Sequence, residues 1–295
     1  MADEASSRSA RLRQRREALQ ARVDSLSERA QEERGHRGWL DATFEIVDRD
    51  AEVAGGIISG ALAYRFFLWL LPAGLVFVGG LGVVAELTSR SPKGVGNSVG
   101  IGGIVANSLQ SASDSKSPWY ALIVGLPLLL YATRSVLRVL IGTHRLVWGE
   151  VRTARPKPTY VDAAKLLGIL VALFTLAGVA GWSRAYSAGA GLVVTVGVIA
   201  GFTGIWLWTS TLLPHRDAGW RDLFPGAIAV GVGLGILQLG AAYLLGPYAL
   251  QKQGTYGALG LAAAMLLGLW ALGRLMIGGA EINATLWERK QRGAA

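Results

Sequence analysis

Six long apolar runs dominate the sequence and limit what the chain can fold into. Each is near the roughly 20 residues that an α-helix needs to cross about 30 Å of hydrocarbon. They lie at residues 55–87, 119–141, 163–182, 191–213, 224–246 and 256–280. The composition agrees, because 52% of the 295 residues are hydrophobic and the mean hydropathy is +0.39. The sequence therefore predicts an all-α, polytopic membrane protein, a bundle of six transmembrane helices.

The basic residues between these runs predict the orientation of the bundle. Cytoplasmic loops of membrane proteins carry an excess of Lys and Arg. The basic loops follow the second, fourth and sixth runs, at Arg145, Arg152, Arg155, Lys157, Arg216, Arg221, Arg289, Lys290 and Arg292. The opposite loops hold fewer basic residues, Arg90, Lys93, Lys116, Arg184 and Lys252. We therefore expect a multi-pass protein of the inner (plasma) membrane with both termini in the cytoplasm.

The two ends of the chain are predicted to lie outside the membrane. Residues 1–37 are a charged cytoplasmic arm whose polar helical pattern fits a solvated helix, with a short coiled-coil contact left open. Residues 38–53 mix apolar and charged side chains and predict an interfacial helix, the first part of a membrane domain over 38–287. A basic tail follows at 288–295. In the first outer loop, the apolar stretch 95–109 is too short to span and predicts a re-entrant or surface helix.

Several function classes lack the residues that they need. There is no cysteine, so thiolate catalysis and cysteine metal sites are excluded. His36, His144 and His215 lie far apart and show no metal-ligand spacing, and no Gly-rich phosphate loop occurs. We expect no metal, no cofactor and no enzymatic activity. The net charge is +9, but the basic residues lie in the N-terminal arm and in the loops that set the orientation of the bundle. No nucleic-acid binding is therefore expected.

Ionisable and amide side chains at membrane depth are the candidate functional residues, because each costs a few kcal/mol in lipid unless it is paired or hydrated. The candidate polar cleft consists of Tyr64, Arg65, Arg134, Arg138, Gln238, Arg274, Glu281 and Asn283. Arg134 and Arg138 share a helix face, as an anion or lipid-phosphate site requires, although snorkelling toward the inner head groups explains them equally well. We expect Glu281 to meet an arginine or backbone donors from the first or second helix.

Glycines recur at small-xxx-small spacing, which lets transmembrane helices approach closely. The pairs are Gly56/Gly60, Gly197/Gly201 and Gly231/Gly235. We interpret them as packing positions.

Successive short segments resemble the YihY/BrkB family of inner-membrane proteins, once labelled ribonuclease BN. The resemblance rests on SGALAY at 59–64, LPHR at 213–216, WRDLFPGA at 220–227, TYGALG at 255–260 and GAEINA at 279–284. It covers residues 39–287 and implies six helices with both termini inside. It also implies a link to serum resistance and, in one branch, to export of lipid-linked material. Arg65 and Trp69 depart from the family's first-helix pattern, so no mechanism is carried over for that helix, and no residue supports ribonuclease activity.

Two hypotheses about function remain. The first is a transporter-like permease that handles lipid or an anionic or phosphate-bearing metabolite, in contact with membrane lipids and with homo-oligomerisation left open. The alternative is a non-catalytic scaffold that binds envelope proteins through its arginine-rich arm. A membrane enzyme ranks third, because no nucleophile, base or metal site is assembled in the sequence.

Overall fold

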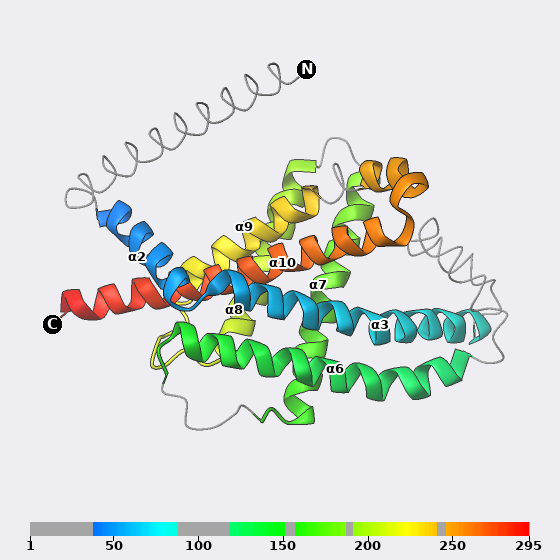
Figure 1. Cartoon of the computed structure of the whole chain (residues 1–295), viewed down its shortest axis with the longest axis horizontal. Coiled ribbons are helices and arrows are strands. Elements are labelled where there is room, and N and C mark those ends of the chain that lie inside the picture. Colours follow the sequence, from blue (N-terminus) through cyan, green and yellow to red (C-terminus); the bar gives the residue numbers. More distant parts are fainter. Residues whose placement is uncertain (1–37, 88–117, 151–156, 187–190, 241–245, 295) are drawn as a thin grey trace, which may run out of the picture. The chain divides into compact units, whose positions relative to one another are not determined.

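The structure of the chain is a computed structural model that describes residues 38–87, 118–150, 157–186, 191–240 and 246–294. Within these residues there are seven α-helices and no strand (Figure 1). The helices are α2 (Gly38–Glu52), α3 (Gly55–Leu87), α6 (Pro118–Val147), α7 (Tyr160–Tyr186), α8 (Gly191–Leu212), α9 (Phe224–Gly240) and α10 (Gly246–Ala294). The chain divides into two compact units, 1–49 and 50–295, and the second unit contains the bundle.

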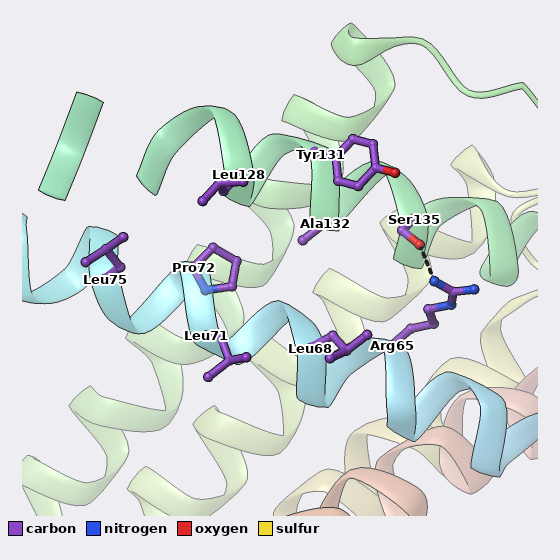
Figure 2. Close-up of a pocket in the computed structure, with 9 residues that line it drawn as sticks. All are labelled: Arg65, Leu68, Leu71, Pro72, Leu75, Leu128, Tyr131, Ala132 and Ser135. Atoms are coloured by element: carbon purple, nitrogen blue, oxygen red, sulfur yellow. Dashed lines mark hydrogen bonds between the residues drawn. The ribbon is translucent and has the colours of Figure 1, made fainter. Parts of the chain in front are cut away.

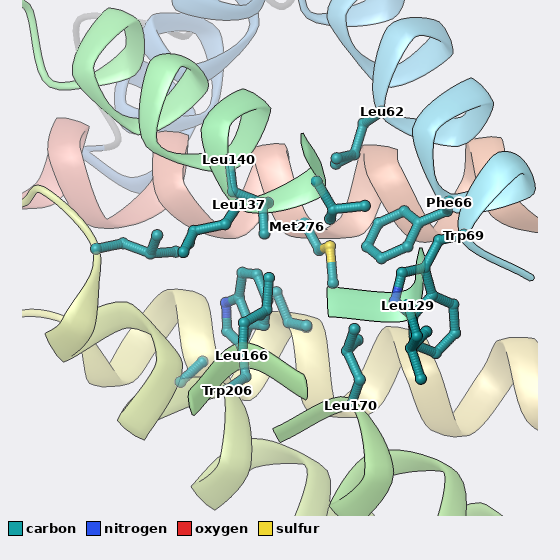
Figure 3. Packing of buried hydrophobic residues seen from close by; sticks show 14 residues of the cluster. Leu62, Phe66, Trp69, Leu129, Leu137, Leu140, Leu166, Leu170, Trp206 and Met276 are labelled. Atoms are coloured by element: carbon teal, nitrogen blue, oxygen red, sulfur yellow. The ribbon is translucent and has the colours of Figure 1, made fainter. Parts of the chain in front are cut away.

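The bundle is built from antiparallel neighbours. In it α3 packs along α6 and α10, α9 lies between α8 and α10, and α7 joins α6 to α8 (Figure 1). These neighbours bury one shared core to which every helix of the bundle contributes. Its members include Leu62, Phe66 and Trp69 of α3, Leu129 and Leu140 of α6, Leu166 of α7, Trp206 of α8 and Met276 of α10 (Figure 3). Val230 of α9 belongs to the same cluster.

Many large apolar side chains lie exposed on the outer surface of the bundle. Ile57, Leu71 and Tyr131 are 78%, 68% and 68% exposed, and Val193 is 74% exposed. Among the described residues, four helical segments are long and apolar enough to cross a membrane, Gly55–Gly80, Trp119–Val147, Val193–Leu212 and Ala262–Gly293. An apolar surface on helices of this length fits a hydrocarbon environment. The protein is therefore a helical membrane protein, while the predicted number of six spans and their orientation stay predictions.

Some of the predicted glycine pairs bring helices together. A Cβ on Gly231 would collide with Thr203 of α8, and one on Gly235 would lie 2.8 Å from Ile199 of the same helix. The α8–α9 crossing therefore requires both glycines. In contrast, nothing lies within 4 Å of the Cβ position of Gly56 or Gly60, so this pair makes no close helix contact within the described part of the chain.

Two sequence predictions lie outside the described residues. These are the cytoplasmic arm at 1–37 and the short apolar helix at 95–109.

Candidate functional site

Arg134 and Arg138 share a helix but not an environment. The Nε of Arg134 donates a 2.7 Å hydrogen bond to the Pro158 carbonyl, and its guanidinium lies 4.7 Å from the centre of the Tyr160 ring. Arg134 therefore fixes the start of α7 against α6. Arg138 is exposed, and it forms no hydrogen bond or ion pair with a residue that the structure describes. The structure thus gives the two arginines different surroundings.

Arg274 is paired with an acid. Its Nη1 lies 2.5 Å from Oδ1 of Asp50, and both side chains are about one-third exposed or less. A Cβ on Gly55 would collide with this Asp50 carboxylate, so the pair lies directly against the first turn of α3. The pair offsets part of the desolvation cost of placing Arg274 in α10. It makes Arg274 a structural contact at the start of the bundle.

Asn283 joins α10 to the first turn of α9. Its Oδ1 accepts a 2.7 Å hydrogen bond from the backbone N–H of Gly226, and Asn283 is only 2% exposed. The first N–H groups of a helix have no partner within it, and Pro225 lacks one altogether, so Asn283 caps α9 from another helix. A Cβ on Gly226 would meet the Gly279 carbonyl and would lie 2.6 Å from Asn283 Oδ1. The segments 224–227 and 279–284 are therefore two sides of one contact.

The other predicted residues have different environments. Glu281 is buried at 2% exposure, and its predicted tie to the first or second helix stays a prediction. Tyr64 is 55% exposed on the outer face of α3, and Gln238 is half-buried in α9. Arg65 donates a 3.1 Å hydrogen bond from Nη1 to Ser135 Oγ across the α3–α6 contact.

A polar cavity lies at the basic end of the bundle, where α6 ends, α7 begins and the chain passes from α8 to α9. Its volume is about 650 Å³. Its charged and imidazole lining consists of Arg145, Glu150, Asp162, Lys165, His215, Arg216 and Asp217, over a floor of Leu and Ile side chains. Three cations and three carboxylates therefore face the same space.

The ion pairs in this cavity are loose. Arg145 Nε lies 3.7 Å from Glu150 and Lys165 Nζ lies 3.8 Å from Asp162, both longer than a charge-assisted hydrogen bond of about 2.8 Å. Asp162 also caps α7, since its carboxylate accepts hydrogen bonds from the N–H and hydroxyl of Thr159. The exposed Lys165 can therefore exchange its partner for a ligand at little cost.

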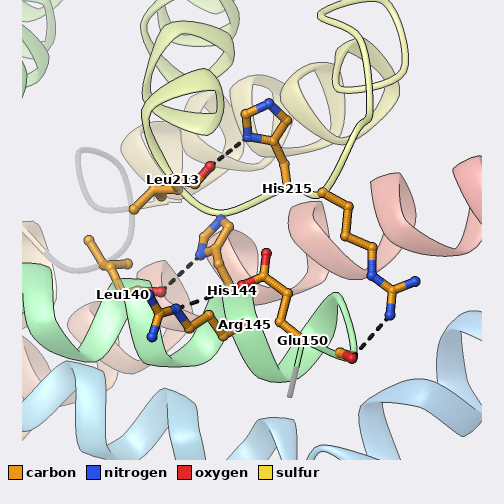
Figure 4. A network of polar contacts seen from close by, with 8 residues as sticks. Leu140, His144, Arg145, Glu150, Leu213 and His215 are labelled. Atoms are coloured by element: carbon orange, nitrogen blue, oxygen red, sulfur yellow. Dashed lines mark hydrogen bonds and ion pairs between the residues drawn. The ribbon is translucent and has the colours of Figure 1, made fainter. Parts of the chain in front are cut away.

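His215 contributes an acceptor to the cavity. Its Nδ1 lies 2.6 Å from the carbonyl of Leu213, and the Nδ1 of His144 lies 3.1 Å from that of Leu140 (Figure 4). A carbonyl can only accept, so Nδ1 carries the proton in each ring and Nε2 of neutral His215 is left as an acceptor. Among the described residues, no group of three or more His, Cys, Asp or Glu side chains is placed to hold a metal ion.

The loop that carries His215 is fastened on both sides. Arg216 Nη2 donates to the Gly149 carbonyl at 3.0 Å, and Nη1 lies 3.8 Å from Glu288 of α10. Arg216 has a positive φ of 50°, which is uncommon in a residue other than glycine. Lys290 donates a 2.7 Å hydrogen bond to Asp222, which lowers the pKa of this carboxyl below its usual range. We refer to these contacts of Arg216 and Asp222 with α10 as the clasp.

None of the residues that line this cavity was predicted from the sequence to be a site residue. Arg145 and Arg216 stand in the basic loops, and His215 lies in the LPHR segment at 213–216. The available signal was that the segments 145–150 and 215–217, which contribute to this cavity, each contain both basic and acidic side chains. No spacing in the sequence shows that the loops after the second and fourth runs meet.

Apolar helices of membrane-spanning length around a charged end define a polytopic α-helical membrane protein. Within that class, the family model of virulence factor BrkB matches residues 52–295, so the chain belongs to the virulence factor BrkB family. The match begins just before α3 and includes every helix of the bundle. No curated protein and no solved structure matches the chain.

Proposed function

We propose that this chain is a transporter-like membrane protein whose polar cavity binds a small solute or lipid head group that carries both an anionic and a cationic group. The observation that carries the proposal is the balanced charge of the cavity, three cationic and three carboxylate side chains around one space. A simple anion would gain from the cations but would be repelled by the carboxylates. A ligand with both charges complements both sets.

The position of the cavity supports a role in movement across the membrane. The cavity lies at the end of the bundle whose loops are basic, the end that charge distribution assigns to the cytoplasm. Its loose pairs, Arg145–Glu150 and Lys165–Asp162, can open to admit a ligand that replaces each partner. His215 Nε2 provides a further acceptor for an ammonium group.

Phosphoethanolamine is a suitable probe, because it joins a phosphate to an ammonium group. We expect it to raise the melting temperature of the purified full chain more than inorganic phosphate or ethanolamine does. Vesicles containing the protein should take up labelled phosphoethanolamine faster than protein-free vesicles. Lys165→Gln should weaken both effects, whereas Lys157→Gln, an exposed lysine outside the cavity, should not.

The comparison separates the outcomes. If phosphate alone stabilises as well as phosphoethanolamine, the cavity is a simple anion site and the proposed ligand class is wrong. If phosphatidylethanolamine stabilises but free phosphoethanolamine does not, the ligand is a lipid head group. Unchanged uptake in Lys165→Gln contradicts a transport role for this cavity.

The scaffold alternative depends on residues 1–34, which lie outside the described part of the chain. It stays a prediction. Its test is deletion of residues 1–34. If the arm is the functional part, the shortened chain should still insert into the membrane but should no longer complement a strain that lacks the protein.

A further inference from the structure

A second cavity, distinct from the polar one, lies between α3 and α6. We refer to it as the groove. Its volume is about 510 Å³, and it is lined by Arg65, Leu68, Leu71, Pro72, Leu75, Leu128, Tyr131, Ala132 and Ser135 (Figure 2). Leu71 and Tyr131 are each 68% exposed and Leu128 is 50% exposed, so the groove opens toward the surroundings of the bundle. In a membrane, those surroundings are acyl chains.

One end of the groove is cationic. The guanidinium of Arg65 lies there and donates to the neutral hydroxyl of Ser135 at 3.1 Å (Figure 2). Within the described residues Arg65 forms no ion pair. Arg138 lies three residues beyond Ser135, on the same face of α6 and about 4.5 Å further along its axis. Two arginines at this end therefore lack a carboxylate among the residues that the structure describes.

The dimensions of the groove match one leaflet. Arg65 and Leu75 are ten residues apart on α3, which is about 15 Å along the helix. This length is half of the roughly 30 Å hydrocarbon thickness. Because α3 starts and α6 ends at the basic end of the bundle, the two arginines point to the same side as the basic loops. Arg65 is also ten residues, about 15 Å, from the first residue of α3, so the cationic end lies inside the bundle on the side of the basic loops. From there the long arginine side chains extend toward inner-leaflet phosphates.

We propose that the groove binds an anionic phospholipid of the inner leaflet, with one acyl chain along Leu68, Leu71 and Leu75 and its phosphate between Arg65 and Arg138. The charge of the site selects this occupant. A zwitterionic lipid brings its own cation close to the two arginines, whereas an anionic lipid such as phosphatidylglycerol adds none. The site is independent of the polar cavity and of the solute proposed for it.

The test is retention of defined lipids by the purified full chain, measured by native mass spectrometry after exchange into phosphatidylglycerol or phosphatidylethanolamine. We expect preferential retention of phosphatidylglycerol. Arg65→Gln and Arg138→Gln should each reduce that retention about fivefold, the effect of one basic residue near an anionic surface. The matched control is Arg221→Gln, because Arg221 is exposed and lies over Trp220, outside the groove.

A second variant tests the chain-binding part of the groove. Leu71→Trp keeps the position apolar but fills the space, and we expect it to lower retention of both lipids without lowering the melting temperature. Equal retention of the two lipids, or equal effects of Arg65→Gln and Arg221→Gln, would overturn the proposal. A dimer mass that Leu71→Trp disrupts would also overturn it, because the groove would then hold a second copy of the chain.

Discussion

The polar cavity and the groove place arginines in opposite circumstances. Around the cavity, Arg216 has a carbonyl and a carboxylate within reach, and Arg145 faces Glu150. Along the groove, Arg65 donates to a hydroxyl and has no carboxylate partner among the described residues, and Arg138 is exposed. A cation that the protein itself neutralises holds segments together, whereas a cation left for the surroundings requires an external anion. The comparison therefore separates arginines that already have a carboxylate beside them from arginines that have none among the described residues.

The largest expected effect is steric and compares one substitution in two places. Gly226→Ala puts a Cβ against the Gly279 carbonyl and the capping Asn283, and we expect it to cost about 3 kcal/mol of stability or to prevent folding. Gly60→Ala on α3 meets nothing within 4 Å and should be neutral or stabilising by up to about 1 kcal/mol. Melting temperatures of the two variants in detergent check this difference. Equal melting temperatures would show that the α9–α10 contact is not tight.

A smaller effect is expected from double-mutant cycles on two arginines. Asp50→Asn with Arg274→Gln should give a coupling energy of about 1–3 kcal/mol, because this pair is direct and half-buried. Arg65→Gln with Ser135→Ala should give less than about 0.5 kcal/mol, since the contact is exposed and involves a neutral hydroxyl. Unfolding of the four variants of each cycle supplies the numbers. A large Arg65–Ser135 coupling energy would show that Arg65 stabilises the fold.

The smallest effect concerns the clasp and depends on pH. The hydrogen bond from Lys290 lowers the pKa of Asp222 from its usual 3.8, so the contribution is present above about pH 4. It is lost as the pH falls through the lowered pKa, because the unfolded state then binds the proton first. An exposed pair contributes up to about 1 kcal/mol, so Asp222→Asn should lower the melting temperature slightly at pH 7.

The same variant should lose part of the acid sensitivity of the parent between pH 5 and pH 3. The control is Asp217→Asn, an exposed carboxylate in the same loop. An identical pH profile for Asp222→Asn and the parent would show that the Lys290 contact contributes nothing to stability.

Hydropathy predicted where helices lie but not how far they continue. The predicted runs 55–87 and 191–213 agree with α3 and α8 within one residue. The predicted 119–141 and 256–280 are too short, since α6 extends to Val147 and α10 covers Gly246–Ala294. The missed parts are polar, and a backbone that leaves the hydrocarbon can stay helical there without an apolar signal.

The candidate site was harder to predict than the helices. Spacing along one helix showed that Arg134 and Arg138 share a face, but it could not show that Pro158 and Tyr160 occupy one of them. Likewise, nothing near Arg274 in sequence indicates Asp50, which is 224 residues away. Long-range neighbours of this kind depend on which helices are adjacent, and a single sequence does not contain that information.

The continuity of α10 limits how the basic end can rearrange. Between Gly273 and Lys290 this one helix contacts Ser59, Asp50, Gly226, Arg216 and Asp222. An unbroken ladder of backbone hydrogen bonds connects all these points over about 26 Å, and a local break would leave polar groups unpaired. The contacts are consequently carried by one continuous helix. A rotation or translation of α10 would therefore change all of these contacts together.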